Sequence, residues 1–166
     1  MANPMYGQNK ADNALDKVGS EVIVAVADKT LAASDSGATV FVNAAAISVT
    51  LPAAKAGLNF KIILGIDTTA GADILCTSGD AFFGIVRLFS DTADQVGVPQ
   101  QISHATAIGT VANYDTMDFV ADTATIGGMA GDVIEVVAVD DTAWHVSADL
   151  TTTQNNPGTV AVIVAS

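Results

Sequence analysis

Two histidines and one cysteine are the side chains best suited to bind a soft metal ion or to act as a nucleophile. His104, His145 and Cys76 lie far apart in the sequence and in different contexts. A zinc site needs three or four ligands brought together, so these residues give little support for one. Cys76 follows Ile74 and Leu75 in an apolar run, which indicates a buried, inert thiol. As the single cysteine of the chain, it also excludes an intrachain disulfide.

Aspartates are grouped in loop-like stretches, where their carboxylate oxygens could bind calcium. The groups are Asp91 with Asp94, Asp115 with Asp118 and Asp122, and Asp140 with Asp141. Calcium takes about six to eight oxygen ligands from a tight loop, and no group has the spacing of an EF-hand loop. We therefore expect solvated turn residues and predict no metal and no cofactor, although calcium binding by these loops stays an open alternative.

Carboxylate pairs and serine triads are the other constellations that could do chemistry here. The glutamates are Glu21 and Glu135 alone, so a glycosidase pair would need distant segments to meet. No G-x-S-x-G sequence marks a nucleophile elbow, and Gly127-Gly128 lies outside any G-x-G-x-x-G phosphate loop. We therefore predict no catalytic residues and a protein that is not an enzyme.

The charge balance restricts the classes of partner. Six lysines and arginines stand against eighteen aspartates and glutamates, which gives a formal net charge of −12. A surface of this sign disfavours contact with nucleic-acid phosphates and with anionic lipid. No apolar run is long enough to span a membrane, and the first residues lack the apolar core of a signal peptide. We expect no nucleic acid and no membrane as partner, and synthesis in a cytoplasm.

The elements that would position any site are β-strands. Apolar and polar residues alternate over 47–51 and again over 58–64, which is the period of a half-buried strand. Pro52 ends the first strand because it has no N–H for the ladder, and Gly57 can adopt the positive φ that reverses the chain. Two such strands cannot be stable alone, so we expect a second sheet to cover their apolar faces.

Similar strand patterns recur along the rest of the chain, separated by Gly, Asp and Pro. We expect strands at 21–27, 38–42, 74–77, 82–89, 101–111, 118–126, 133–139, 144–147 and 160–164. This spacing is typical of all-β proteins. We predict one domain over 21–166, all-β, built as an antiparallel β-sandwich or a jelly-roll-like barrel.

The predicted core follows from the same alternation. It should contain Leu51, Phe60 and Trp144, together with Ile134 or Val136. Because successive side chains of a strand point to opposite faces, the residue after Trp144, a histidine, should face away from this core.

Residues 1–20 lack strand alternation and are predicted to form a polar N-terminal arm. The arm contains Met5 and Tyr6, which could anchor in a pocket of a partner, and Lys10 and Lys17, a third of all basic residues. We expect these four residues to contact a partner surface or a neighbouring subunit. A disordered terminus is an equally good interpretation of the same segment.

Two separated stretches contain a recurring order of residues. The first runs Asp35-Ser36-Gly37, Val40-Phe41-Val42-Asn43, Val49-Thr50-Leu51-Pro52 and Gly57-Leu58-Asn59-Phe60. The second runs Gly131-Asp132-Val133-Ile134-Glu135-Val136-Val137, Asp140 and Trp144-His145-Val146-Ser147. Together they resemble a pattern in tailed-phage virion proteins, notably those of marine phages. The two pieces span 35–64 and 127–148, while residues 73–122 match no part of the pattern.

The resemblance implies a structural role in a virion. Such modules occur in tail fibres and in small proteins that decorate the outside of a head, and a short acidic chain with an arm fits a decoration or cement protein better. We therefore expect a homotrimer that binds the major capsid protein and stabilises the capsid surface. The alternative is a tail- or fibre-associated module for host recognition. A small glycan-degrading enzyme is the third and least favoured interpretation.

Overall fold

The computed structural model describes residues 21–67, 72–90, 99–105, 115–119, 128–152 and 163–164. These residues form twelve β-strands and one short 3-10 helix. The first half contains β1 (Val22–Ala25), β2 (Lys29–Thr30), η1 (Ala33–Asp35), β3 (Thr39–Val42), β4 (Ser48–Thr50), β5 (Asn59–Leu64) and β6 (Asp73–Leu75). The second half contains β7 (Ala81–Ser90), β8 (Pro99–Ala105), β9 (Thr116–Asp118), β10 (Val133–Ala138), β11 (Ala143–Thr152) and β12 (Ile163–Val164).

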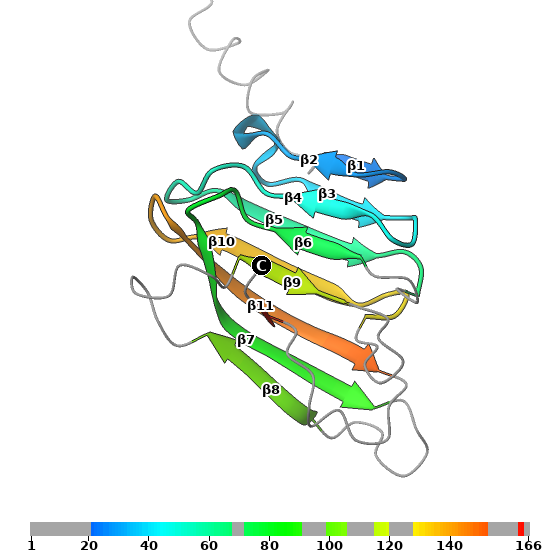
Figure 1. The fold of residues 1–166 in the computed structure, drawn as a ribbon. Coiled ribbons are helices and arrows are strands. Elements are labelled where there is room, and N and C mark those ends of the chain that lie inside the picture. Colours follow the sequence, from blue (N-terminus) through cyan, green and yellow to red (C-terminus); the bar gives the residue numbers. More distant parts are fainter. Residues whose placement is uncertain are drawn as a thin grey trace, which may run out of the picture.

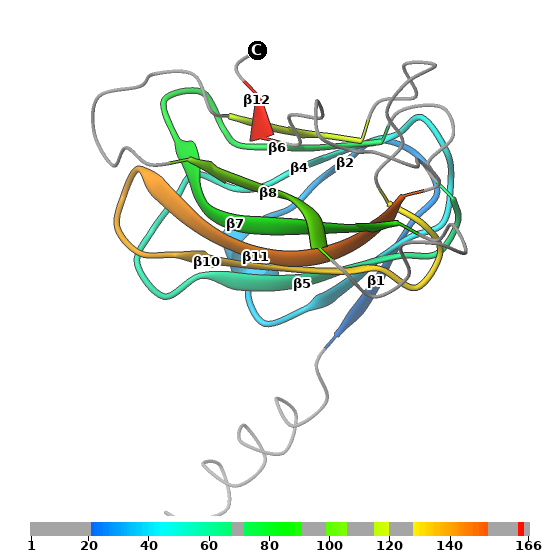
Figure 2. The same ribbon diagram turned by 90° about the horizontal axis from the view of Figure 1, so that it is seen from below.

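The strands are arranged in two sheets that lie as layers one over the other (Figures 1 and 2). The large sheet has seven strands in the order β1-β3-β5-β10-β11-β7-β8, and the small sheet has five in the order β12-β9-β6-β4-β2. The prediction of an all-β protein is confirmed for the described residues. Within this part of the chain, no helix is long and apolar enough to cross a membrane.

The first six strands alternate between the two layers. β1, β3 and β5 are parallel neighbours in the large sheet, and β2, β4 and β6 are parallel neighbours in the small sheet. Each pair of successive strands therefore makes one coil around the core, and the coils stack side by side. The predicted antiparallel arrangement is wrong for this half, because each crossover between parallel strands runs through the opposite sheet. A return through the other layer serves the purpose that a helix serves in βαβ units.

A β-hairpin interrupts this stack of coils. β10 and β11 pair with each other, and β10 pairs with β5 while β11 pairs with β7. The hairpin therefore lies between β5 and β7, two strands that would otherwise be the next neighbours in the series of coils. Hydrogen bonds bound the β5–β10 pair at both ends, from the Gly131 amide to the Leu64 carbonyl and from the Ala138 amide to the Leu58 carbonyl.

The core fills the space between the layers and draws on both sheets. Leu51, Phe60, Ile134, Val136 and Trp144 are all buried, as predicted. The rings of Phe60 and Trp144 pack against each other with 6.0 Å between their centroids. The strand assigned to 133–139 is confirmed as β10, and its inward residues alternate with exposed ones.

The turn between the two strands of residues 47–64 has the predicted geometry. β4 ends before Pro52, and Gly57 has a φ of 94°. The Gly57 amide donates to the carbonyl of Ala138, which ties the turn to the end of β10. The turn therefore carries the chain from the small sheet to the large one.

Other predicted strands differ in extent. β11 continues to Thr152, beyond the predicted end at 147, because it pairs with β7 along its whole length. β9 covers residues 116–118, and most of the predicted strand 118–126 lies outside the described residues. β2 was not predicted, since two residues carry no readable alternation. The arm at 1–20 also lies outside the described residues.

Trp144→Ala should lower the free energy of unfolding by about 3–5 kcal/mol. The ring is fully buried and packs on Phe60, so its removal leaves a large cavity between the layers. Urea titration followed by circular dichroism measures the change. His145→Ala, which truncates the exposed neighbour, is the matched control. A loss below about 1 kcal/mol would contradict a packed core at this position.

Gly84→Ala should destabilise the protein by about 2–4 kcal/mol. Gly84 has a φ of 140°, and a Cβ there would collide with the carbonyl oxygen of Val146 on β11. Gly79→Ala is the matched control, because Gly79 has a φ of 96° but open space around the new methyl group. We expect the control to cost about 1–2 kcal/mol through backbone strain alone. Equal losses in the two variants would show that β7 and β11 are not in close backbone contact at Gly84.

Candidate interaction surface

The large sheet has one face on the core and one face turned away from it, here called the outer face. Along β10, Ile134, Val136 and Ala138 are buried, whereas Glu135 and Val137 are exposed. The same alternation continues on neighbouring strands, so register places outward side chains in rows across the sheet. One face of a large mixed sheet is thus available for contacts.

A polar row crosses the middle of this outer face. Glu135 stands directly opposite Lys61 of β5 on one side and Ser147 of β11 on the other. Opposite charges facing each other across antiparallel strands stabilise the pairing by a few tenths of a kcal/mol up to about 1 kcal/mol. The position of Glu135 is therefore explained by its place on the outer face of the sheet.

An ion pair joins β7 to β11 next to this row. Arg87 donates from Nε to Oδ1 of Asp149 over 2.5 Å, and the two residues are paired in the strand register. The hydrogen bond to Asp149 raises the pKa of the Arg87 guanidinium, and the charge of Asp149 adds to the effect. Both side chains are more than a third exposed, so solvent screens the pair and its contribution to stability is small.

A pocket of about 470 Å³ opens beside the ion pair. Asp132, directly before β10, and Glu135 within it contribute polar groups to the lining. The other polar groups come from β11, namely from Ser147, Asp149 and Thr151. Phe89 of β7 contributes an aromatic side chain to the wall. The pocket therefore combines carboxylates, hydroxyls and one ring on the outer face.

Asp132 is occupied by the chain itself. Its Oδ2 accepts the amide hydrogens of Met129 (2.9 Å) and Thr151 (2.6 Å), and its Oδ1 accepts the Thr151 hydroxyl (2.9 Å). Burial raises the pKa of this carboxyl even though these hydrogen bonds oppose the shift. Asp132 thus ties the start of β10 to the end of β11, a clamp that the Gly-Asp dipeptide before a strand could have suggested.

An apolar patch lies at the other end of the same strands. Val137, His145 and Phe83 follow one another across β10, β11 and β7 in the register. The rings of Phe83 and His145 meet edge to face with 5.2 Å between centroids. Val139 and Ile85, which are also exposed, extend the patch. His145 faces away from Trp144, as predicted.

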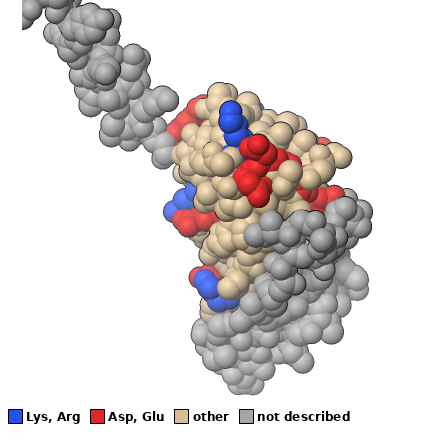
Figure 3. Space-filling view, turned by 90° about the vertical axis from the view of Figure 1, so that its left-hand side faces the viewer, with Lys and Arg blue, Asp and Glu red and all other residues tan. Residues whose placement is uncertain are grey.

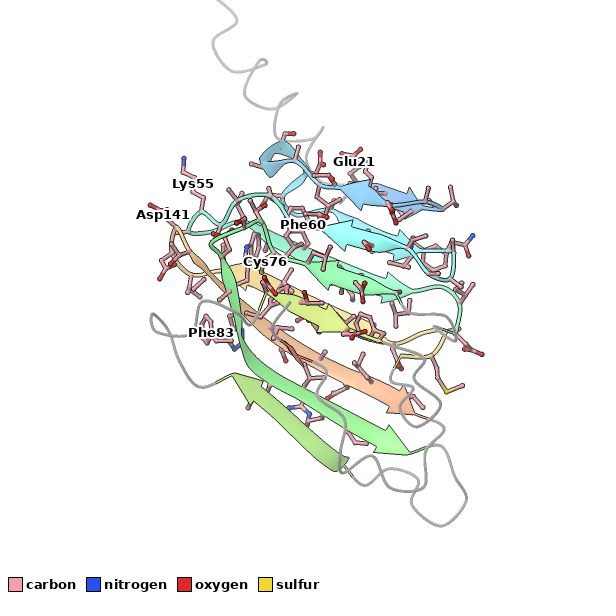
Figure 4. The ribbon with its side chains drawn as sticks, in the orientation of Figure 1. Glu21, Lys55, Phe60, Cys76, Phe83 and Asp141 are labelled. Carbon is pink, nitrogen blue, oxygen red and sulfur yellow. The ribbon has the colours of Figure 1, made fainter. Side chains whose placement is uncertain are left out.

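Charge is unevenly distributed over the described surface. Figure 3 shows the charged side chains gathered in a few clusters with uncharged surface between them. Figure 4 places Lys55 and Asp141 at one end of the layers, near the turn that joins β10 to β11. In this turn, Asp140 accepts the Thr142 amide and hydroxyl hydrogens through Oδ1. The hydrogen bond from the Thr142 amide is the main cause that lowers the pKa of Asp140. Asp140 therefore lies in a turn, as the sequence predicts.

The small sheet contains two carboxylates that face each other across neighbouring strands. Asp73 of β6 stands opposite Asp118 of β9, and Asp118 Oδ1 is buried with no hydrogen-bond partner among the described residues. Burial raises the pKa of Asp73, and the charge of Asp118 and a hydrogen bond with it add to the effect. Burial first, and then the like charge across the neighbouring strand, therefore favour the protonated form of Asp73.

The predicted chemical residues are not brought together in the described part of the molecule. Cys76 is buried, and burial, followed by the charges of Asp80 and Asp115, raises the pKa of its thiol, which fits the inert role predicted for it. His104 belongs to β8, whose side chains lie outside the described residues. Across the described ranges, no three His, Cys, Asp or Glu side chains are grouped so as to hold a metal ion.

The four predicted contact residues of the arm, Met5, Tyr6, Lys10 and Lys17, lie outside the described residues. Their role stays a prediction. Sequence reasoning missed the Asp132 clamp, which joins the two ends of one hairpin and has only the Gly-Asp dipeptide as a signal. It also missed the Arg87–Asp149 pair and the pocket beside it, because they depend on the pairing of β7 with β11, two strands that are distant in the sequence.

Comparisons with known proteins identify no relative. No family model, no curated protein and no solved structure matches this chain. The resemblance to tailed-phage virion proteins therefore stays a prediction, and the binding properties of the protein follow from its own surface.

The Asp73–Asp118 pair predicts how stability depends on pH. Because the pKa of Asp73 is raised in the folded state, its protonation stabilises the fold below the ordinary value of 3.8, and this stabilisation is lost as pH rises through the folded value. Asp73→Asn should therefore be more stable than the wild type at neutral pH. The difference should shrink as the pH is lowered toward 3.8. Melting temperatures measured over this range test the prediction.

Asp140→Asn is the control with the opposite sign. The pKa of Asp140 is lowered, so its charged form stabilises the fold above 3.8 and the contribution is lost as pH falls through the folded value. This variant should be less stable than the wild type at neutral pH. A stability difference for Asp73→Asn that does not change with pH would rule out a raised pKa for Asp73 in the folded state.

Proposed function

We propose that the protein is a non-enzymatic virion structural protein that decorates and stabilises the outer surface of a phage capsid as a trimer. One observation carries the proposal. The two stretches that resemble virion proteins are far apart in the sequence, yet β5 from the first and β10 from the second are paired neighbours in the large sheet. Their adjacency supports the interpretation that both belong to one structural module.

The two layers form a β-sandwich in this proposal. Buried residues of both sheets share one core, which includes Phe60 and Trp144 from the large sheet and Ile74 and Met117 from the small one. Figure 4 labels Phe60 and Cys76, which belong to this common interior. A rigid, closely packed body suits a protein whose role is to brace a shell, because close-packed interiors have low compressibility.

The outer face of the large sheet provides surface for subunit contacts. The apolar patch around Val137, His145 and Phe83 adjoins the polar row of Lys61 and Glu135. An apolar centre with a polar rim is the usual composition of a protein–protein interface. In this proposal, the partners at the capsid surface are the major capsid protein and other copies of the chain, after synthesis in the host cytoplasm.

Host recognition at a tail or fibre is the second candidate, and the pocket favours it. Glu135, Ser147 and Thr151 provide hydrogen-bonding groups and Phe89 provides a ring, which is the chemistry that binds a sugar. Hydrolysis of a glycan is less well supported. A glycosidase needs two carboxylates facing the bond, whereas Asp132 is held by the chain and Asp149 by Arg87.

The number of copies in purified virus particles tests the proposal most directly. A decoration protein covers the shell, so its copy number should be comparable with that of the major capsid protein. A tail or fibre protein should be present in only a few copies per particle. Quantitative mass spectrometry of particles gives this ratio, and complete absence from particles would exclude both virion functions.

Deletion of residues 1–17 tests the role of the arm in attachment. We expect a nearly unchanged melting temperature, because residues 1–17 lack the strand alternation of the rest of the chain and should add little to the core. We also expect a large loss of copies retained on particles, since Met5, Tyr6, Lys10 and Lys17 are the predicted contacts. Substituting Lys10 and Lys17 by glutamine in the full chain removes the two positive charges and keeps Met5 and Tyr6. This variant therefore measures the contribution of the charges to attachment separately from that of the two anchor residues. Full occupancy by the truncated protein would place the capsid contact on the sandwich instead.

A further inference from the structure

β1 is the outermost strand of the large sheet at one end. It pairs with β3 alone among the described strands. The carbonyls of Glu21 and Ala25 accept the amide hydrogens of Thr39 and Asn43, each over 2.8 Å. In a parallel ladder, alternate residues face the neighbour, so the N–H and C=O groups of Val22 and Val24 point to the free side. The described part of the chain supplies no partner for this side.

The side chains of this strand are unusually exposed for their type. Val22, Val24 and Val26, here called the valine edge, are 62%, 55% and 65% exposed. They are the three most exposed large hydrophobic residues in the described part of the chain. Edge strands are normally protected from pairing by charges, prolines or bulges, and residues 22–27 contain no charge and no proline.

Both layers end here as far as the described strands show. β2 is the outermost strand of the small sheet, and three residues connect it to β1. Figure 1 shows both strands at the same end of the molecule, far from β8, and Figure 2 shows them in opposite layers. Among the described residues, the first coil of the stack therefore has a neighbour on one side only, whereas the coils formed by β3 with β4 and by β5 with β6 have paired strands on both sides. An added pair of strands could extend both sheets together.

We propose that the valine edge is the contact to a second copy of this chain, made by antiparallel pairing of β1 with β1 of the partner copy. A two-fold axis through Val24 places Val22 opposite Val26 of the other copy and Ile23 opposite Ala25. Every such pair is apolar. The free N–H and C=O groups of Val22 and Val24 then pair across the axis, and the large sheet continues from one copy into the next.

Charge favours a second copy as the occupant of this edge. Two chains with a net charge of −12 repel each other over most of their surfaces. The valine edge is uncharged, and in the two-fold register Glu21 faces Ala27 and no acidic residue meets another. A basic partner strand would find no acidic row on β1 to receive it. Self-association at this edge therefore brings no like charges directly opposite each other.

The contact differs from the proposed trimer contact. A two-fold contact joins two copies, so in a particle it would link neighbouring trimers into a continuous layer. The inference does not require the protein to be in a virion, and its test uses the purified chain in solution. A chain that forms no trimers should give dimers through this edge, whereas a trimer carries three such edges and should give larger assemblies. In both cases an edge variant should have a lower mass than the wild type.

Val24→Lys tests the inference by placing a charge at the centre of the edge. Lysine on an edge strand opposes pairing, and the side chain is exposed, so the fold should tolerate it. Light scattering after size exclusion, at several protein concentrations, should give the variant a lower mass than the wild type, and half of it where the unpaired protein is a monomer. Val24→Pro should act in the same way, because it removes the outward N–H while the hydrogen bonds to β3 use other residues.

Ser78→Lys is the charge-matched control, since Ser78 is exposed in the turn between β6 and β7, outside both the valine edge and the apolar patch. It should keep the wild-type mass. Equal masses for wild type and Val24→Lys would overturn the inference, as would an equal loss of mass for Ser78→Lys. If deletion of residues 1–20 doubles the mass whereas the full chain does not pair, the arm occupies the edge and the inference is wrong.

Hydrogen exchange provides an independent readout. The amides of Val22 and Val24 should exchange more slowly as the protein concentration rises, because pairing protects the outward groups. The amide of Ala25, which the parallel ladder directs toward β3, should change little. Exchange at Val22 and Val24 that is independent of concentration, in a sample that self-associates, would place the contact elsewhere.

Discussion

The position of the β10–β11 hairpin in the large sheet is the constraint on which the other features of the fold depend. The hairpin is the only link in this sheet between β1-β3-β5 on one side and β7-β8 on the other, as far as the described residues show. Its inward residues, among them Ile134, Val136, Trp144 and Val146, are fully buried. Without it, the large sheet would be divided into two parts and the small sheet would lose much of the core that it covers.

Asp132 and Gly84 maintain this position from opposite sides. The Asp132 carboxylate binds groups at the start of β10 and at the end of β11, so it fixes the two strands of the hairpin relative to each other. Gly84 permits the backbone of β7 to approach Val146 closely. The same packing forms the pocket and the Arg87–Asp149 pair on the outer face. The surface that we propose for binding is therefore a consequence of the hairpin insertion.

Local pattern predicted the strands and the core better than it predicted their pairing. Alternation identified Leu51, Phe60 and Trp144 as core residues because burial on one face leaves a period of two in the sequence. Pairing leaves no such local trace, so neither the parallel coils nor the union of β5 with β10 could be predicted. The open end at β1 follows from the coil arrangement and was missed for the same reason. The valine edge has a sequence signal, because residues 22–27 are uncharged and valine stands at every second position. The exposure of these valines follows only from the strand order.

Native-state hydrogen exchange tests the central claim about the hairpin most directly. If the hairpin joins the two parts of the large sheet, the amides of Val136 and Val146 should exchange only through global unfolding. Their opening free energies should then equal the free energy of unfolding and fall with denaturant at the same slope. Exchange through a smaller opening, while the amides of β3 and β5 stay protected, would contradict the account, because the rest of the fold would then persist without the hairpin.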